Sequence, residues 1–282
     1  MPYGKTISSF FSITPTLHYS IIPLLPFPVS NTYYSSTQSM LTPDEKQRYQ
    51  RQILLSGWGE EGQEKIKRST VFIAGAGGLG SPVAIYLAAA GIGRLIICDS
   101  GATELTNLNR QVLHRDRDIG RNKTRSARET INRINPLVTV ETLEDHIVKD
   151  NVSQLVGSAD IIVDCMDNFS TRHILNAYAC AAGLPFVHAG VTGMSGQITF
   201  IHTPETPCLF CFIPKSTPSA VFPIVGATAG VIGTLEALEV LKYLTGKGTL
   251  LKSRMLFWDG EFMQFHEVPL QKDPHCNVCG KH

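Results

Sequence analysis

The residues best suited to chemistry are acids and cations spread along a 282-residue chain. Asp99 follows the apolar run RLIIC, and Arg110 and Lys123 come after it. A second acid, Asp167, follows the apolar run ADIIVDC, and Arg51 lies in the segment RYQRQ. Cations neutralise charge that develops on phosphates, and a carboxylate holds Mg²⁺. This set therefore predicts phosphoryl chemistry on a nucleotide.

A glycine-rich segment, GAGGLG, supplies the expected phosphate site. It lies between an expected strand, 70–76, and an expected helix, 81–90, which is the context that the GxGxxG motif requires. Gly75 permits a tight turn, Gly77 lets a phosphate approach the backbone, and Gly80 lets helix and strand pack closely. The free N–H groups at the start of the helix favour an anion.

Asp99 ends the next expected strand, 19 residues after Gly80, where an acid accepts hydrogen bonds from ribose hydroxyls. NAD, FAD and ATP all use this geometry, so these residues alone leave the nucleotide open. The carboxyl ends of parallel strands share one edge of a sheet, so Asp99 and Asp167 are expected to line one crevice. Asp167 and Asn168 have an alternative interpretation as the cap of the following helix.

The pattern of elements indicates an α/β fold. Strands and helices alternate from Thr70 to Gly190, which predicts a parallel, Rossmann-like sheet with helices on both faces. After Gly196 the runs QITFIH, RMLFWDG and FMQFHEV predict antiparallel strands, so the whole sheet is expected to be mixed. The expected elements are strands 70–76, 94–99, 138–143, 159–165 and 185–190, and helices 42–55, 60–68, 81–90, 123–135, 169–183 and 226–246.

The first 39 residues differ from the rest. They contain no acid and one lysine, and prolines interrupt their apolar patch, which argues against a signal peptide. We expect residues 1–41 to be a disordered extension or an artefact of upstream translation, with Met40 as the natural start. Residues 42–282 are expected to form one domain, which opens with a helix capped by Thr42.

Composition excludes several classes of function. The net charge of +1 gives no global attraction to nucleic acid or an acidic membrane, and no uncharged apolar run reaches the ~18 residues of a transmembrane helix. The pairing of cysteines favours metal ligands over disulfides and a reducing, cytoplasmic location. Cys98, Cys165 and Cys180 are expected to be buried small hydrophobes.

Four further cysteines form two CxxC pairs, and a tetrahedral, closed Zn²⁺ site is the predicted outcome. Their wide separation requires the pairs to meet through the fold. A redox-active CxxC is the alternative. The four predicted ligands are Cys208, Cys211, Cys276 and Cys279.

Together, these motifs resemble the ThiF/MoeB/HesA family, adenylyltransferases related to ubiquitin-activating enzymes. The resemblance runs in order from about Tyr49 to Cys279. It is carried by RYQRQ, GAGGLGS, the TNLNRQ run at 106–111, GxxK at 120–123, DCMDN at 164–168 and the two CxxC pairs.

The resemblance implies that ATP adenylates the C-terminal glycine of a small ubiquitin-like sulfur-carrier protein ending in Gly-Gly. Gly78 would contact the nucleotide and Asp99 the ribose, and Arg51 would reach ATP across a homodimer. The triphosphate would be held by Thr106, Asn107, Arg110 and Lys123, and the Mg²⁺ by Asp167 with Asn168 beside it.

Two departures from the family pattern bear on mechanism. Gly101 stands where an acid is usual, two residues beyond Asp99. No cysteine lies between Cys211 and Cys276, and Ser219 occupies about the position where relatives often carry one. We therefore expect adenylation without an enzyme thioester, with sulfur delivered by a separate donor. The alternatives are an NAD- or FAD-dependent oxidoreductase and a nucleotide-binding adaptor without catalysis.

Overall fold

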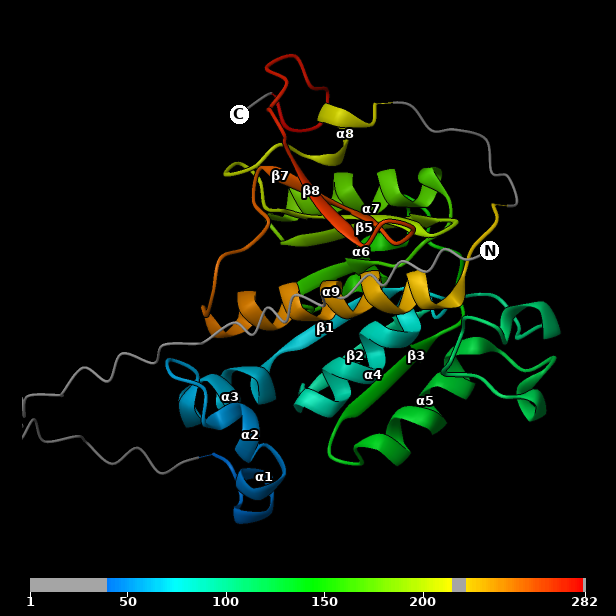
Figure 1. The fold of residues 1–282 in the computed structure, drawn as a ribbon, viewed down its shortest axis with the longest axis vertical. Coiled ribbons are helices and arrows are strands. Elements are labelled where there is room, and N and C mark those ends of the chain that lie inside the picture. Colours follow the sequence, from blue (N-terminus) through cyan, green and yellow to red (C-terminus); the bar gives the residue numbers. More distant parts are fainter. Residues whose placement is uncertain (1–39, 215–221, 281–282) are drawn as a thin grey trace, which may run out of the picture. The chain divides into compact units, whose positions relative to one another are not determined.

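The computed structural model describes residues 40–214 and 222–280, and its centre is a mixed sheet (Figure 1). Within the described residues the sheet has eight strands in the order β3-β2-β1-β4-β5-β6-β7-β8. The first five strands of this order pair in parallel, and β5 to β8 pair antiparallel. The strands are β1 (Thr70–Ala74), β2 (Arg94–Cys98), β3 (Thr139–Leu143), β4 (Ile161–Asp164), β5 (Phe186–Thr192), β6 (Ser195–Ile201), β7 (Arg254–Asp259) and β8 (Gln264–Pro269).

Helices cover both faces of this sheet, as the sequence predicted. The described helices are α1 (Pro43–Arg48), α2 (Gln50–Ile53), α3 (Gly59–Arg68), α4 (Gly80–Ala90), α5 (Lys123–Ile134), α6 (Val152–Val156), α7 (Phe169–Ala182), α8 (Leu209–Phe212) and α9 (Gly226–Thr245). Two short 3₁₀ helices, Leu105–Asn107 and Asp116–Asp118, lie in the long connection between β2 and α5.

Alternation along the strands divides the core into two layers. Ile73 of β1 packs with α3, α4, α5 and α9, whereas its neighbour Phe72 packs with α6, α7 and α8. Both side chains are fully buried. Successive residues of a strand point to opposite faces, so an apolar run such as TVFIA suits a strand covered on both sides. The expected α/β architecture with a mixed sheet is confirmed.

Helix α9 packs closely against the glycine-loop side of the sheet. A Cβ on Gly226 would lie 2.2 Å from the carbonyl oxygen of Asn109, and one on Gly233 would lie 2.6 Å from that of Leu79. Real Cβ atoms do not approach so closely, and only glycine permits these contacts. The small residues of this long helix thus place its first turns beside the nucleotide-binding motifs.

Three local features differ from the sequence prediction. The helix expected from 42 to 55 is divided at Tyr49 into α1 and α2, although the predicted capping box between Thr42 and Glu45 is present. Helices α6 and α8 were not predicted. Strand β4 ends at Asp164, so Asp167 follows the strand by three residues and does not end it. The predicted extension lies outside the described residues apart from Met40 and Leu41.

Candidate functional site

The glycine loop follows β1 at the carboxyl edge of the sheet, where Gly75 has a φ of +99°. A Cβ on Gly75 would lie 2.7 Å from the carbonyl oxygen of Cys165, and one on Gly80 would lie 2.0 Å from the carbonyl oxygen of Gly75. Both positions therefore require glycine. The loop forms the tight turn that the motif predicts, and α4 begins at Gly80 with its N–H groups at this edge.

Asp99 lies against this loop, immediately after β2. One of its carboxylate oxygens accepts the N–H of Ala76 at 2.8 Å, and the other accepts the N–H of Gly101 at 2.8 Å. Each carboxylate oxygen has two lone pairs, so each retains an acceptor site for a ribose hydroxyl. The predicted proximity of the acid to the glycine motif is present, and its geometry fits a nucleotide.

Two cations lie near these groups, Lys123 beside Gly101 and Arg110 beside the glycine loop. Lys123 begins α5, donates its N–H to the carbonyl of Gly101 at 3.0 Å, and places Nζ 3.4 Å from the point that a Cβ on Gly101 would occupy. The Cγ of Arg110 lies 3.6 Å from the corresponding point on Gly78. In residues 40–214 and 222–280, no carboxylate forms a salt bridge with either cation. Their charges are therefore available to an anionic ligand.

Arg110 is held in place by its own loop. Its Nη1 donates to the carbonyl of Thr106 at 2.9 Å and to Oδ1 of Asn109 at 3.0 Å. Asn107 accepts the N–H of Glu104 through Oδ1, and the Thr106 hydroxyl donates to the Glu104 carboxylate at 3.3 Å. Thr106 and Asn107 thus stabilise the 3₁₀ turn that orients the arginine, and their predicted phosphate contacts stay predictions.

Gln111 was part of the quoted motif but was assigned no role. Its side chain is 5% exposed, and Nε2 lies 3.6 Å from the point that a Cβ on Gly77 would occupy. Oε1 of Gln111 is buried and has no hydrogen-bond partner among the described residues. The amide therefore lies over the phosphate loop, a position that the sequence motif alone does not reveal.

His114 connects the glycine loop to helix α5. Its Nε2 lies 2.9 Å from the carbonyl oxygen of Ala76, and its Nδ1 lies 3.0 Å from the hydroxyl of Ser126. Burial lowers the pKa of His114 because a charged imidazole loses solvation there. The neutral ring joins α5 to the glycine loop, a contact that sequence reasoning did not find.

The loop after β4 carries the second predicted acid. Asp167 is exposed, and its carboxylate accepts a hydrogen bond from the side-chain amide of Asn168 at 3.3 Å. Asn168 Oδ1 accepts the N–H of Thr171 at 2.9 Å and thereby caps α7. The helix-cap alternative is thus confirmed for Asn168, while the Asp167 carboxylate, a hard oxygen ligand of the kind Mg²⁺ prefers, does not cap the helix.

Behind this loop lies a buried group of ionisable side chains that sequence analysis missed. The carboxylate of Asp164 lies 2.7 Å from His188 Nδ1 and 3.8 Å from Arg172 Nε. Burial lowers the pKa of His188 and raises the pKa of Glu236 well above its usual value. Both side chains are therefore neutral, and the Arg172 cation balances the Asp164 anion. Asp164 belongs to the quoted DCMDN motif but was assigned no role, and no local pattern marks Arg172, His188 and Glu236 as its neighbours.

Arg51 is exposed on α2 and lies far from the glycine loop of its own chain. Its neighbour Gln52 donates to the carbonyl of Ala90, the last residue of α4, at 2.7 Å. Helix α4 begins at Gly80 and is about 16 Å long. Arg51 is therefore the one predicted site cation that the described chain does not bring to the nucleotide motifs.

The two CxxC pairs meet, as predicted, at the other end of α7. The four thiol sulfurs lie within 4.8 Å of one another. Cys208 and Cys276 are 3.6 Å apart and Cys211 and Cys279 are 3.4 Å apart, so neither pair is a disulfide. A tetrahedral zinc with bonds of about 2.3 Å requires sulfurs roughly 3.8 Å apart. The donor set and its spacing fit Zn²⁺.

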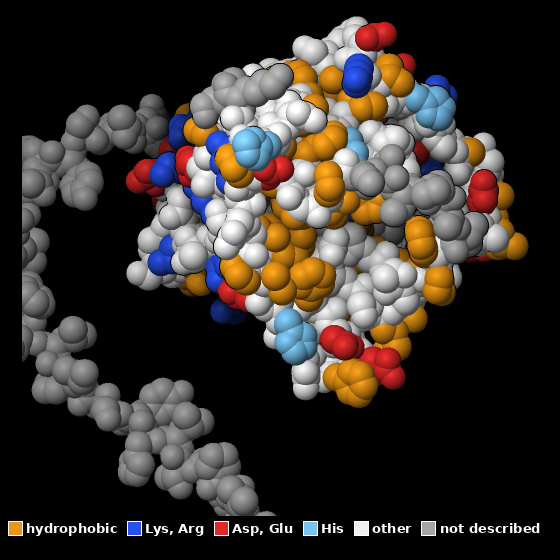
Figure 2. Space-filling model, turned by 90° about the horizontal axis from the view of Figure 1, so that it is seen from above, with side chains coloured by type: hydrophobic (Ala, Val, Ile, Leu, Met, Phe, Trp, Pro, Cys, Tyr) orange, Lys and Arg blue, Asp and Glu red, His pale blue; other side chains and the backbone are white. Residues whose placement is uncertain are grey.

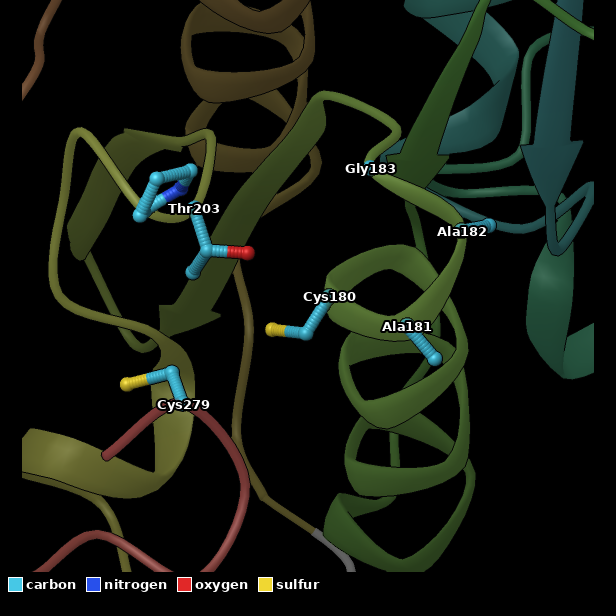
Figure 3. Close-up of a pocket in the computed structure, with 7 residues that line it drawn as sticks. Cys180, Ala181, Ala182, Gly183, Thr203 and Cys279 are labelled. Atoms are coloured by element: carbon cyan, nitrogen blue, oxygen red, sulfur yellow. The ribbon is translucent and has the colours of Figure 1, made fainter. Parts of the chain in front are cut away.

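Of the three remaining thiols, Cys98 and Cys165 are buried as expected. Cys180 is half-buried instead, because a pocket of about 410 Å³ opens beside it. Figure 3 shows its thiol pointing from α7 toward Thr203 and Cys279. The expectation of a buried Cys180 was therefore only partly correct.

Comparison with known proteins decides the family. The sequence profile of the ThiF family matches residues 49–278. The chain belongs to the ThiF family. It is 41% identical to the heterocyst HesA protein of Trichormus variabilis, over 85% of this chain and 91% of that one. It is 37% identical to the sulfur carrier protein adenylyltransferase of Thermus thermophilus, over 85% of this chain and 92% of the relative.

Two further comparisons agree. The SAMP-activating enzyme E1 of Haloferax volcanii is 39% identical, over 83% of this chain and 88% of that enzyme. The crystal structure of Escherichia coli MccB with ATP superposes with a TM-score of 0.73 at 27% identity, covering 83% of this chain and 74% of MccB. This ThiF-family chain is an adenylyltransferase.

In the described residues of this ThiF-family chain, no helix has both the length and the apolar character to cross a membrane.

Figure 2 looks onto the end of the molecule that carries α8 and the C-terminal segment. Hydrophobic side chains form several patches there, with charged side chains among them. This mixed surface shows no extensive field of one sign.

Proposed function

We propose that this ThiF-family enzyme uses ATP to adenylate the C-terminal glycine of a small ubiquitin-like sulfur-carrier protein. The carboxylate oxygen of that glycine attacks the α-phosphorus, an acyl-phosphate bond forms, and the bond to the β-phosphate breaks to release pyrophosphate. The observation that carries the proposal is a pair of cations, Arg110 beside Gly78 of the glycine loop and Lys123 beside Gly101, that form no salt bridge with a carboxylate of the described residues. The relatives named for carrier activation support the substrate class.

The attacking group needs no general base, because a carboxylate is already ionised at neutral pH. The protein has to align the carboxylate with the α-phosphate and neutralise charge on the departing pyrophosphate. The backbone N–H groups of the glycine loop, including Gly78, bind the phosphates of the nucleotide. The carboxylate of Asp99 accepts hydrogen bonds from the ribose hydroxyls. Thr106 and Asn107 orient the triphosphate with the two cations.

Asp167 is the residue we propose for the Mg²⁺ that accompanies ATP. The ion would neutralise phosphate charge and hold the triphosphate in a reactive shape. The exposed carboxylate of Asp167 fits this role, whereas the oxygen of Asn168 already accepts two hydrogen bonds at the start of α7. Asn168 therefore positions the loop and does not bind the ion directly.

Arg51 completes the site in our proposal from a second protomer. Within one chain it lies at the end of α4 opposite the glycine loop. If the α4 helices of two protomers pack antiparallel about a twofold axis, the end of one α4, beside which Arg51 of α2 lies, is brought to the start of the other α4. The α4–α9 surface offers an apolar groove for this contact, with Tyr86 52% and Val112 61% exposed. The proposed unit of activity is thus a homodimer.

The thiols of the chain favour adenylation without an enzyme thioester. Burial raises the pKa of Cys98 to about 12 and that of Cys165 well above its usual value, so neither forms a thiolate at neutral pH. Cys180 lies three turns along α7 from the Asp167 loop, a distance of about 16 Å. Ser219 lies outside the described residues. We therefore propose a separate sulfur donor.

The four-cysteine cluster is proposed to hold a structural Zn²⁺. Four thiolates fill the coordination of the ion and leave no open position for a reacting group. The cluster joins the start of α8 to the C-terminal segment, most of whose residues are exposed. Its role in this proposal is stability.

A nucleotide-binding adaptor is the second candidate, and Gly101 is the observation that favours it. The usual acid is missing there, and a Cβ would lie 3.1 Å from Asp99 Oδ1. The oxidoreductase alternative does not explain why Arg110 and Lys123 lie beside the nucleotide motifs. ATP–pyrophosphate exchange, measured against a panel of Gly-Gly carriers, separates the three. We expect carrier-dependent exchange. ATP binding without exchange with any carrier supports the adaptor, and reduction of a bound NAD or FAD supports the oxidoreductase.

A further inference from the structure

The backbone N–H and C=O of Met166 are both bonded to charged side chains. Its N–H donates to Oδ1 of Asp164 at 3.1 Å. Its carbonyl accepts hydrogen bonds from Nε of Arg172 at 3.1 Å and from Nη2 of the same guanidinium. Both hydrogen-bonding groups of this loop residue are thus satisfied by side chains of the protein, which fixes the turn.

The two groups that hold Met166 are themselves held. Asp164 is fully buried and shares Oδ2 with His188, and Arg172 is 6% exposed with its guanidinium 5.3 Å from the centre of the Phe169 ring. The opposite charges of Asp164 and Arg172 balance within this enclosed space. Both side chains are almost entirely shielded from solvent, so their charges act on groups inside the protein.

Asp167 lies between two residues that are held by hydrogen bonds. Met166 precedes it, with its backbone bonded to Asp164 and Arg172, and Asn168 follows it, with its side chain capping α7. The backbone on either side of Asp167 is thus immobilised, while its carboxylate stays exposed. The same turn presses on the phosphate loop, because the carbonyl of Cys165 leaves no room for a side chain on Gly75.

We propose that Arg172 is a positioning residue for Asp167, and that its grip on Met166 sets where the Asp167 carboxylate meets the Mg²⁺ of Mg·ATP. This inference rests on the Mg²⁺ role proposed above for Asp167. Arg172 touches neither nucleotide nor metal. It acts through one peptide bond, and its planar fork supplies two donors to one carbonyl, which a lysine ammonium does not reproduce in the same geometry.

Calorimetry measures the dissociation constant of ATP for each variant, first with Mg²⁺ and then with EDTA. The ratio of the two constants gives the gain in ATP affinity that depends on Mg²⁺. Arg172→Lys keeps the buried charge balanced. The double variant Arg172→Gln with Asp164→Asn removes both charges together, so neither leaves an isolated buried ion. Asp167→Asn reports the loss of the ligand itself, and Arg254→Lys, in an exposed pair with Glu267, is the matched control.

We expect Arg172→Lys to reduce the Mg²⁺-dependent gain in ATP affinity by about tenfold, the scale found when partners that orient metal ligands are removed. The double variant should lose at least as much, and Arg254→Lys should match the wild type. A merely structural Arg172 would weaken binding equally with and without Mg²⁺ and leave the ratio unchanged, which would overturn the proposal.

The design separates this inference from the proposed function. If Asp167→Asn loses the Mg²⁺ gain and both Arg172 variants keep it, the positioning role is wrong and the Mg²⁺ role of Asp167 stands. If Asp167→Asn also keeps it, both are wrong. None of these readouts needs a carrier protein, so failure to find carrier-dependent adenylation leaves the outcome intact.

Discussion

A carboxylate oxygen of Asp99 accepts the N–H of Ala76 at 2.8 Å, so the acid that follows β2 is fixed against the loop that follows β1. The two motifs are separated by 23 positions in the chain and joined by one hydrogen bond. This contact gives the carboxylate a defined orientation before any nucleotide arrives, which reduces the entropy lost on binding.

The contact leads to a prediction about ribose recognition. Asp99→Asn should weaken ATP binding by about tenfold or more, because an amide is a poorer acceptor than a charged carboxylate. The loss should vanish when 2′,3′-dideoxy-ATP replaces ATP, since the hydroxyls that Asp99 serves are then missing. Calorimetric titration of wild type and variant with both nucleotides gives the coupling free energy between Asp99 and the ribose hydroxyls. The exposed Asp150→Asn is the control, and an equal loss with both nucleotides would contradict the ribose role.

Buried histidines should make stability depend on pH. Burial lowers the pKa of His114 and His188 in the folded chain below the unfolded value near 6.5. The unfolded chain therefore binds more protons as the pH falls, and stability is complete above about pH 7 and declines toward pH 5. Each histidine contributes a slope of at most about 1.4 kcal/mol per pH unit.

Thermal or urea unfolding at a series of pH values measures this slope. His114→Gln keeps an amide that bonds in the same place and does not titrate, so its slope between about pH 7 and pH 5 should be shallower than that of the wild type. The exposed His275→Gln should leave the slope unchanged. Equal slopes in wild type and His114→Gln would show that His114 does not titrate in this range.

Zinc should be bound by the described cysteine cluster and be needed for stability. Purified, reduced protein should contain zinc at one ion per chain, and Cys276→Ser should lose it and unfold at a lower temperature, because four thiolates are required for the closed site. Cys180→Ser is the matched control, since its thiol lies beside the cluster but outside the four-sulfur group. Metal-free wild type protein of unchanged stability would exclude this role.

Arg51 should act on the partner's site. Arg51→Ala and Arg110→Ala should each abolish pyrophosphate exchange when alone. When the two variants are unfolded together and reassembled, half of the random dimers pair one with the other, and one of their two sites is then intact. About a quarter of wild type activity should return. No recovery, despite mixed dimers seen by native mass spectrometry, would place Arg51 outside the partner's site.

Local sequence was sufficient for the long elements and for most of the nucleotide motif, but not for the short helices α6 and α8. Gly75, Gly80 and Asp99 could be placed because their roles depend on strand ends and backbone geometry. The cysteine pairs could be matched because only metal ligation or redox chemistry explains two CxxC motifs, and the fold then brings them together.

Residues whose roles arise from tertiary packing could not be predicted. Arg172, His188 and Glu236 lie far apart in the sequence, and they meet only when β5, α7 and α9 pack together with β4. His114 contacts Ala76 across 38 positions of sequence. The expected strand 159–165 extends one residue beyond the end of β4, because Cys165 continues the apolar pattern past the point where the strand ends at Asp164.

The central claim is that the chain activates a carrier carboxylate with ATP, and ATP–pyrophosphate exchange tests it most directly. With wild type enzyme and a panel of carriers ending in Gly-Gly, labelled pyrophosphate should enter ATP only when a cognate carrier is present. Arg110→Ala should lower that rate at least ~100-fold, since it removes a cation from the developing charge. Exchange that is absent with every carrier, or equally fast without one, would contradict the account.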